Sequence, residues 1–264
     1  MFNLVTGFTQ VKDNLTIMID FGNYCLRSIN PHTGQTSLYA GHCRKHGSAD
    51  GQLIGEASFR NPYAITSYQG RFYVTDYGNN ALRMIAAGKV STIMKLPFPR
   101  GLIFTADGSA YITLYKYGLF RLDLPTKSMT KLTNGAGPTG SLSAAQLSSP
   151  RGLTFLSSSV VLITDSIRQQ LLHADISNNT ITEICDGTRE TRDGDIKSCQ
   201  LDSPSSVLVV NQSVFVGQDD AIRKLTMPAL SETVHPTEST TTSPGESRPV
   251  SFCNAFVLIN PCFL

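Results

Sequence analysis

The sequence has no tryptophan and little charge. Asp, Glu, Lys and Arg together make up 16% of its 264 residues, against roughly 25% in an average soluble domain. The two signs nearly balance, with 22 basic and 20 acidic residues and a formal net charge of +2. This balance excludes an acidic disordered chain and weakens any interpretation built on a general basic field for nucleic acid.

Long hydrophobic runs are also absent. The longest uncharged apolar runs cover residues 160–164 and 255–259, and both are too short to cross a bilayer, so we expect no membrane span. Residues 1–11 have neither a basic region nor an apolar core, and they do not have the pattern of a signal peptide. We expect the natural start to lie upstream, because the first recognisable repeat begins almost at residue 1. A cytosolic chain is the alternative.

The six cysteines include no C-x-x-C pair, so the spacing typical of a zinc ribbon is absent. They fall instead into three pairs, each close together in the sequence, which is typical of local disulfides. The candidate disulfides join Cys25 with Cys43, Cys185 with Cys199, and Cys253 with Cys262.

Sequons for N-glycosylation accompany the cysteines. They begin at Asn14, Asn178 and Asn211, and each fits the Asn-x-Ser/Thr acceptor pattern. Paired cysteines and sequons together predict an oxidising location, either extracellular or on a cell-surface ectodomain.

Helix signals are nearly missing, and turn signals recur every few residues. An internal repeat takes their place, in which an apolar strand, a polar corner and a second strand follow one another. Five copies begin at Thr16, Phe72, Ala110, Val161 and Val214. Their aligned corner positions recur about every 40 to 55 residues. These positions are Asp20, Asp76, Leu114, Asp165 and Gly217.

A second motif recurs in the connections, where a small residue, an apolar residue and a proline keep the same spacing. It covers residues 57–62, 145–150 and 199–204, and a shorter form ends at Gly101. Proline lacks the N–H that a strand ladder needs, so it fits the entry to an inner strand. Each repeat then contains about four short strands, which predicts an all-β propeller of about five four-stranded blades.

The predicted propeller covers residues 1–231, and residues 232–264 are predicted to be a linker and tail. The tail includes a Thr/Ser/Pro-rich stretch at 235–245 with no apolar periodicity. Such a composition buries too little apolar surface to order itself, so we expect this segment to be disordered.

The segments FYVTDYGNNALRMI from Phe72, TIMIDFGNYCLRSI from Thr16 and VFVGQDDAIRKL from Val214 resemble the NHL repeat. The resemblance covers residues 5–227. It is weaker in the third and fourth copies, where Leu114 and Leu172 stand in place of the expected Asp and Arg. NHL propellers more often have six blades, so the resemblance implies either a five-bladed ring or an open part of a larger one.

The repeated corner residues have two interpretations. They form either a ring of ligand contacts on one face, or a structural unit in which the carboxylate accepts backbone N–H bonds and the Arg packs over the neighbouring blade. We favour the structural unit, because the pattern recurs through the whole fold. The residues concerned are Asp20, Arg27, Asp76, Arg83, Asp165 and Arg223.

A metal-dependent enzyme is one alternative, because relatives of the NHL family include zinc-dependent amidating lyases and metal-dependent lactonases. Such a site needs His or carboxylate ligands from several blades. The sequence has only 5 histidines, and the closest two, His42 and His46, lie in a single loop. We therefore predict that the chain is not an enzyme, with no catalytic residue, no metal and no cofactor.

RNA binding is the other alternative, because the resemblance extends to intracellular tripartite-motif proteins whose NHL propellers bind RNA on a basic face. The candidate basic residues are the cluster 44–46 and the pair Arg100 and Arg151, which follow proline at equivalent strand entries. We interpret Arg100 and Arg151 as ordinary solvated residues and expect no nucleic-acid partner.

The remaining interpretation is a non-catalytic, extracellular NHL-type propeller that acts as a binding module for a protein or glycan partner. Loops on a rigid scaffold suit such a role. The sequence assigns no ligand-binding residue.

Overall fold

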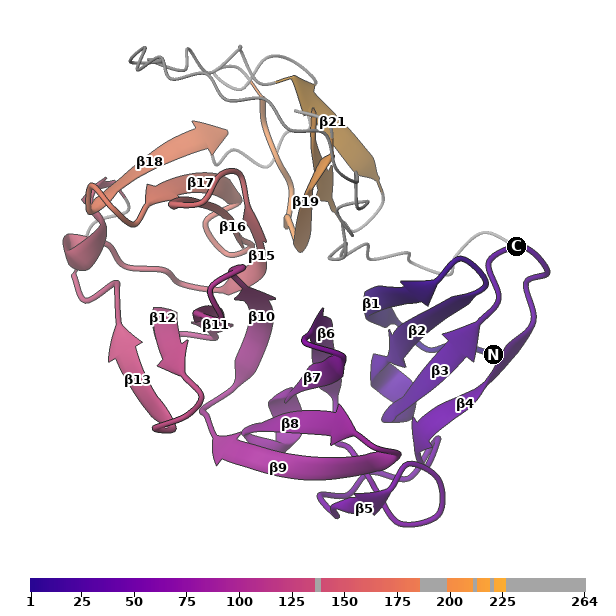
Figure 1. The fold of residues 1–264 in the computed structure, drawn as a ribbon. Coiled ribbons are helices and arrows are strands. Elements are labelled where there is room, and N and C mark those ends of the chain that lie inside the picture. Colours follow the sequence, from indigo (N-terminus) through magenta and orange to yellow (C-terminus); the bar gives the residue numbers. More distant parts are fainter. Residues whose placement is uncertain (136–138, 186–198, 211–212, 219–220, 227–264) are drawn as a thin grey trace, which may run out of the picture.

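The computed structural model describes residues 1–135, 139–185, 199–210, 213–218 and 221–226. These residues form five antiparallel sheets set around one axis as the blades of a propeller (Figure 1). The predicted all-β propeller with five blades is therefore confirmed. Among the described residues, no helix has the length and hydrophobicity needed to cross a bilayer.

Blades 1 and 2 are meanders in which each strand pairs with the next one outward. Blade 1 consists of β1 (Val5–Lys12), β2 (Leu15–Asp20), β3 (Cys25–Ile29) and β4 (Thr36–Gly41). Blade 2 consists of β6 (Pro62–Tyr68), β7 (Arg71–Asp76), β8 (Ala81–Ala86) and β9 (Lys89–Lys95), with the short β5 (Gly51–Gln52) added outside β9. The 3-10 turns η1 (Phe21–Asn23) and η2 (Tyr77–Asn79) follow the second strands of these blades.

Blades 3, 4 and 5 repeat this plan. Blade 3 consists of β10 (Pro99–Phe104), β11 (Ala110–Leu114), β12 (Gly118–Asp123) and β13 (Ser128–Lys131). Blade 4 consists of β15 (Pro150–Phe155), β16 (Val160–Asp165), β17 (Gln170–Asp175) and β18 (Thr180–Cys185). Its outer edge carries β14 (Gly140–Ser141), which is followed by the 3-10 turn η3 (Leu142–Ala144). In blade 5 the described strands are β19 (Ser206–Val210), β20 (Ser213–Gly217) and β21 (Ile222–Thr226).

The five inner strands surround the axis. β1 packs beside β6, β6 beside β10, β10 beside β15, and β15 beside β19. Among the described residues, β19 and β1 do not pack together in the same way, and in Figure 1 the described strands of blades 5 and 1 lie apart.

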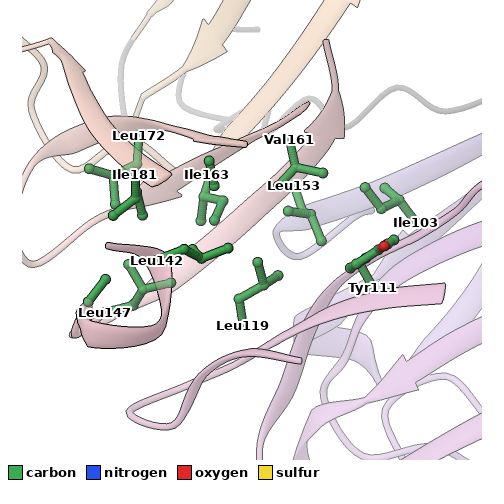
Figure 2. Packing of buried hydrophobic residues seen from close by; sticks show 12 residues of the cluster. Ile103, Tyr111, Leu119, Leu142, Leu147, Leu153, Val161, Ile163, Leu172 and Ile181 are labelled. Carbon is green, nitrogen blue, oxygen red and sulfur yellow. The ribbon is translucent and has the colours of Figure 1, made fainter. Parts of the chain in front are cut away.

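The hydrophobic core lies between the blades, because a single twisted sheet is apolar on both faces and cannot cover either face alone. Side chains in β16 alternate accordingly. Val161 and Ile163 pack toward blade 3, and Leu162 packs toward blade 5. Figure 2 shows the layer between blades 3 and 4, in which Leu119 of blade 3 meets Leu153 and other residues of blade 4. Four such layers join the five blades.

The predicted proline entries are confirmed for three blades, since Pro62, Pro99 and Pro150 are the first residues of β6, β10 and β15. Glycine follows at Gly101 because the next blade comes very close. A Cβ built there would lie 2.5 Å from the backbone oxygen of Arg151. The recurring Pro-Arg-Gly segment therefore reflects tight contact between neighbouring inner strands.

Register places equivalent residues of every blade at one end of the ring. The first residue of each inner strand pairs with the last residue of the second strand. These pairs are Val5 with Asp20, Pro62 with Asp76, Pro99 with Leu114, Pro150 with Asp165, and Ser206 with Gly217. We call this end of the ring the entry face and the opposite end the far face.

Candidate functional site

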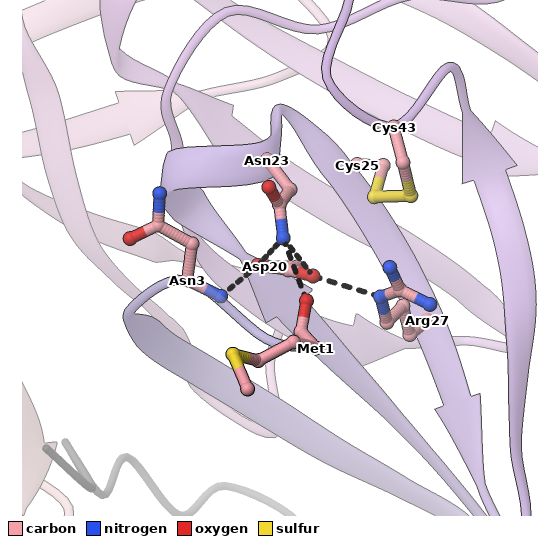
Figure 3. Close-up of a disulfide and its surroundings, with 7 residues drawn as sticks. All are labelled: Met1, Asn3, Asp20, Asn23, Cys25, Arg27 and Cys43. Carbon is pink, nitrogen blue, oxygen red and sulfur yellow. Dashed lines mark hydrogen bonds and ion pairs between the residues drawn. A yellow bond between two sulfur atoms is a disulfide. The ribbon is translucent and has the colours of Figure 1, made fainter. Parts of the chain in front are cut away.

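The corner carboxylate of blade 1 holds its turn against the entry to β1. Asp20 is fully buried and accepts hydrogen bonds from the backbone N–H of Asn3 at 2.8 Å and from Nε of Arg27 at 2.7 Å. Nδ2 of Asn23 also donates to both carboxylate oxygens (Figure 3). The Asp20 carboxylate is thus held by hydrogen bonds from other groups of blade 1 and the segment before it.

Blade 2 repeats the arrangement and extends it. Asp76 accepts from the N–H of Arg60 at 2.9 Å, from Nδ2 of Asn79 at 2.8 Å and from Nη1 of Arg83 at 2.7 Å. Burial raises the pKa of Asp76, and these three partners offset part of that effect. Arg83 also donates to the backbone oxygen of Ser58 at 3.0 Å, so it joins the blade to the connection from blade 1.

Blades 4 and 5 depart from the pattern as their sequences do. Asp165 accepts the backbone N–H groups of Ser148 and Ser149 at 2.6 and 2.9 Å. Leu172 is fully buried in the interblade core in place of the expected Arg. In blade 5, Gly217 occupies the corner and Arg223 lies on β21.

Two of the predicted disulfides are present. Cys25, the first residue of β3, is bonded to Cys43 after β4 (Figure 3). Cys185 at the end of β18 is bonded to Cys199, which precedes β19. The candidates Cys253 and Cys262 lie outside the described residues.

The two described sequons share the far face. Asn14 lies in the turn between β1 and β2, and Asn178 lies in the turn between β17 and β18. Both side chains are exposed. Asn211 lies outside the described residues. Glycans on Asn14 and Asn178 would leave the entry face uncovered.

Five aromatic side chains form a continuous row on the entry face across blades 1, 2 and 3. Neighbouring ring centroids are 6.1, 6.4, 5.6 and 6.5 Å apart along the row. We call this set the aromatic row, and its members in order are Phe21, Tyr63, Tyr77, Phe98 and Tyr115. Phe98 is 40% exposed, so solvent or a ligand can reach the row at this ring.

Arg100 lies against this row and is only 9% exposed. Its guanidinium carbon is 4.3 Å from the ring centroid of Tyr115 and 5.4 Å from those of Tyr63 and Tyr77. Nη1 donates to Oγ of Ser149 at 2.9 Å. The interpretation of Arg100 as a solvated residue was therefore wrong.

The charge of Arg100 has no counter-ion among the described residues, where no carboxylate lies within ion-pair distance of it. Its buried Nε also has no hydrogen-bond partner there. Cation–π contacts with tyrosine faces stabilise the guanidinium without engaging its N–H groups, and Nε keeps its proton unshared within the described part of the chain. Aromatic walls and an uncompensated cation together suit an anionic ligand that also carries apolar surface.

The sequence contained a signal of this site in the repetition of Pro-Arg-Gly. It also carried part of the aromatic row, because Phe21, Tyr77 and Tyr115 each follow the corner position of their repeat. Tyr63, which follows an entry proline, and Phe98 occupy other places in the repeat, and no pattern in the sequence links them to the row. Only stacking of the blades brings them together.

The candidate metal ligands are dispersed. His42 and His46 lie in the loop after β4, and His173 lies on β17. In the part of the chain that the structure describes, no three His, Cys, Asp or Glu side chains form a group suited to a metal ion.

No protein-family model matches the sequence, and no curated protein matches it. Solved structures do share the fold. A nidogen/laminin complex matches with a TM-score of 0.61 and 13% identity, over 84% of this chain and 75% of the other. A candidate gluconolactonase matches with a TM-score of 0.59 and 16% identity, over 85% and 75%. A streptogramin B lyase matches with a TM-score of 0.53 and 12% identity, over 86% and 70%.

These neighbours are propellers of the six-bladed type, whereas five blades are described here. The streptogramin B lyase and the candidate gluconolactonase also correct the prediction that the chain is not an enzyme. That prediction was wrong, because the same fold carries enzymes and the absence of a familiar motif does not exclude catalysis.

Proposed function

We propose that this chain is an extracellular, N-glycosylated propeller of the NHL-repeat type that binds a protein partner on its entry face. The observation that carries the proposal is the aromatic row with Arg100 against it. Tyrosine and arginine are the residue types enriched in protein interfaces, because each offers a large contact area and a polar group.

The position of the row on the scaffold supports binding. Its rings come from turns and strand entries that the interblade core and the corner carboxylates hold in place. Such a site loses little conformational entropy when a partner binds. The nidogen/laminin structure is that of a protein complex, which shows that the fold can take part in one.

The two disulfides support the extracellular part of the proposal, since disulfides persist in oxidising compartments. The sequons support it too, because Asn14 and Asn178 are exposed and lie away from the proposed binding face. The NHL assignment rests on the repeat strings quoted above.

The location is tested by secretion from eukaryotic cells behind a heterologous signal peptide. We expect no free thiol at Cys25, Cys43, Cys185 or Cys199, and a loss of mass on glycosidase treatment. Free thiols and empty sequons on a folded chain would contradict the extracellular assignment and make RNA binding the next property to measure.

The binding face is tested by selecting binders from a displayed random peptide library and measuring their affinity for two matched variants. Phe98→Asp places a charge in the aromatic row, and Met129→Asp places one on the outer strand β13, where Met129 is 38% exposed. We expect most binders to lose affinity for Phe98→Asp and to keep it for Met129→Asp. Equal effects of the two variants would contradict the proposed face.

A further inference from the structure

Arg100 is unusual because a cation buried to this degree normally has a carboxylate beside it. The corner carboxylates of the flanking blades are already engaged. Asp76 is paired with Arg83, and Asp165 accepts the N–H groups of Ser148 and Ser149. Neither can turn to Arg100 without leaving buried groups unsatisfied. The protein therefore maintains an unpaired, largely desolvated guanidinium.

Contacts from three blades hold Arg100 in place. The backbone oxygen of Arg100 accepts a hydrogen bond from Oγ1 of Thr75 in blade 2 at 2.7 Å. Its side chain is anchored to blade 4 through Ser149, whose Oγ also accepts from Oγ of Ser166 at 2.9 Å. Contacts from blades 2, 3 and 4 thus orient one side chain whose buried Nε has no protein partner among the described residues.

A second arginine accompanies the first. Arg151 occupies the same place in blade 4, directly after the entry proline, and β10 and β15 pack side by side. Oγ1 of Thr113 donates to its backbone oxygen at 3.1 Å, as Thr75 does for Arg100. Its Nε is also buried without a hydrogen-bond partner in the described structure. The two inner strands therefore present two cations at the entry face.

The surroundings determine which anion fits. Polyanions such as nucleic acids are bound by extended rows of exposed Lys and Arg. Here one cation is 9% exposed and faces three neutral rings. A single planar carboxylate matches the fork of N–H groups on a guanidinium, and the rings suit an apolar neighbour of that carboxylate.

We propose that Arg100, with Arg151 beside it, anchors an Asp or Glu side chain of the protein partner, and that the aromatic row holds an apolar side chain next to that acid. This deepens the proposed function and rests on it. The contact is a hydrogen-bonded ion pair, and no covalent step is involved.

The test begins with binders from the displayed peptide library that depend on Phe98. We expect their sequences to share an acidic residue beside an aromatic or large aliphatic one. Each binder is then synthesised in two capped forms, one with the acid and one with the corresponding amide, and titrated calorimetrically. The acidic form should bind about tenfold more tightly or better, as expected for a charge-assisted hydrogen bond.

Arginine variants locate the contact. Arg100→Gln should remove most of the preference for acid over amide, and Arg151→Gln should reduce it. Arg71→Gln is the matched control, because Arg71 is exposed and lies at the β6–β7 turn on the far face. The control should keep the full preference. Circular dichroism establishes that each variant is folded.

If Arg100→Gln does not fold, the contact between Arg100 and the carboxylate is tested on the wild-type protein. The Nε–Hε resonances of its arginines are recorded by NMR during titration with the acidic and amide peptides. Two arginine resonances should shift with the acidic form only, and one of these two should be missing from the spectrum of Arg151→Gln. Shifts that are equal for both peptides would overturn the proposal.

The outcomes separate this inference from the proposed function. Some binders could depend on Phe98 and yet bind equally well in the acid and the amide form. That result would support the binding face and overturn the proposed contact between Arg100 and a carboxylate. Binders that ignore Phe98→Asp overturn the face itself. Inorganic sulfate that displaces the peptide as effectively as acetate does would overturn the choice of a carboxylate as the ligand.

Discussion

The guanidinium of Arg83 meets the carboxylate of Asp76 at 2.7 Å, and almost no solvent reaches either side chain. Arg83 also lies over the ring of Phe59, with its guanidinium carbon 5.2 Å from the ring centroid. The equivalent pair in blade 1, Arg27 with Asp20, has the same separation but an arginine that is 21% exposed. The two blades thus provide a buried and a partly solvated version of one contact.

Replacing Arg83 by methionine is expected to destabilise the protein by about 3–5 kcal/mol, because the buried carboxylate of Asp76 would lose its charged partner. Arg27→Met is the matched control and should cost less, since water can approach Asp20 once the side chain is gone. Urea unfolding of the two variants measures the difference. Equal losses of stability in the two variants would contradict the expectation that the more buried ion pair is the more costly one to break.

We expect Asp50 to make the stability of blade 2 depend on pH. Burial raises the pKa of Asp50, but hydrogen bonds from Thr92 and the charge of Arg83 outweigh this effect and hold the pKa below its usual value. A lowered folded-state pKa stabilises the protein above the unfolded value of about 3.9 and loses that effect as the pH falls through the folded value.

Asp50→Asn should therefore lower stability at neutral pH, by about 1 kcal/mol or less because the Asp50 side chain is 47% exposed. The difference from wild type should shrink as the pH falls below about 4. Unfolding curves measured across this range check the sign. A difference that stays constant into acid would mean that the charge of Asp50 contributes nothing.

The disulfides close loops with sequence separations of 18 and 14 residues. Replacing both cysteines of either pair by serine should cost about 3 kcal/mol, because the unfolded chain regains the entropy that the crosslink removed. Thermal unfolding under non-reducing conditions measures the loss. In the presence of a strong reductant, the wild type and the variants should become equally stable.

Gly101→Ala should destabilise the interface between blades 3 and 4 by about 1–3 kcal/mol, since the added methyl group would meet the backbone oxygen of Arg151. Ala64 takes the corresponding place in blade 2, and Ala64→Gly is a control for backbone freedom alone. The control should cost less than Gly101→Ala. If Gly101→Ala left the stability unchanged, the inner strands β10 and β15 would be able to move apart without cost.

Removal of residues 232–264 tests the predicted domain boundary. Their composition predicts no packed structure, so Tm should change by less than about 2 °C, which corresponds to less than about 1 kcal/mol for a domain of this size. Differential scanning calorimetry makes the comparison. A large fall in Tm would place part of this segment within the propeller.

Periodicity in the sequence is sufficient to predict the blades. Alternating strands, turn residues and entry prolines act locally, and each repeat follows the same local rules, so these rules alone place the strand pairs and the inner-strand entries. Two disulfides are equally accessible from the sequence, because Cys25 and Cys43, like Cys185 and Cys199, are near one another along the chain.

The surroundings of Arg100 in the candidate site were decided by tertiary structure. Arg100 was expected to be solvated, since nothing beside it in the sequence covers it. Its neighbours Tyr63, Tyr77 and Tyr115 come from two blades and from two different places in the repeat. Packing one inner strand against the next brings the rings over the guanidinium, and the same packing keeps carboxylates away from it. The sequence by itself thus determined each blade through local patterns, whereas only the ring determined which residues share its entry face.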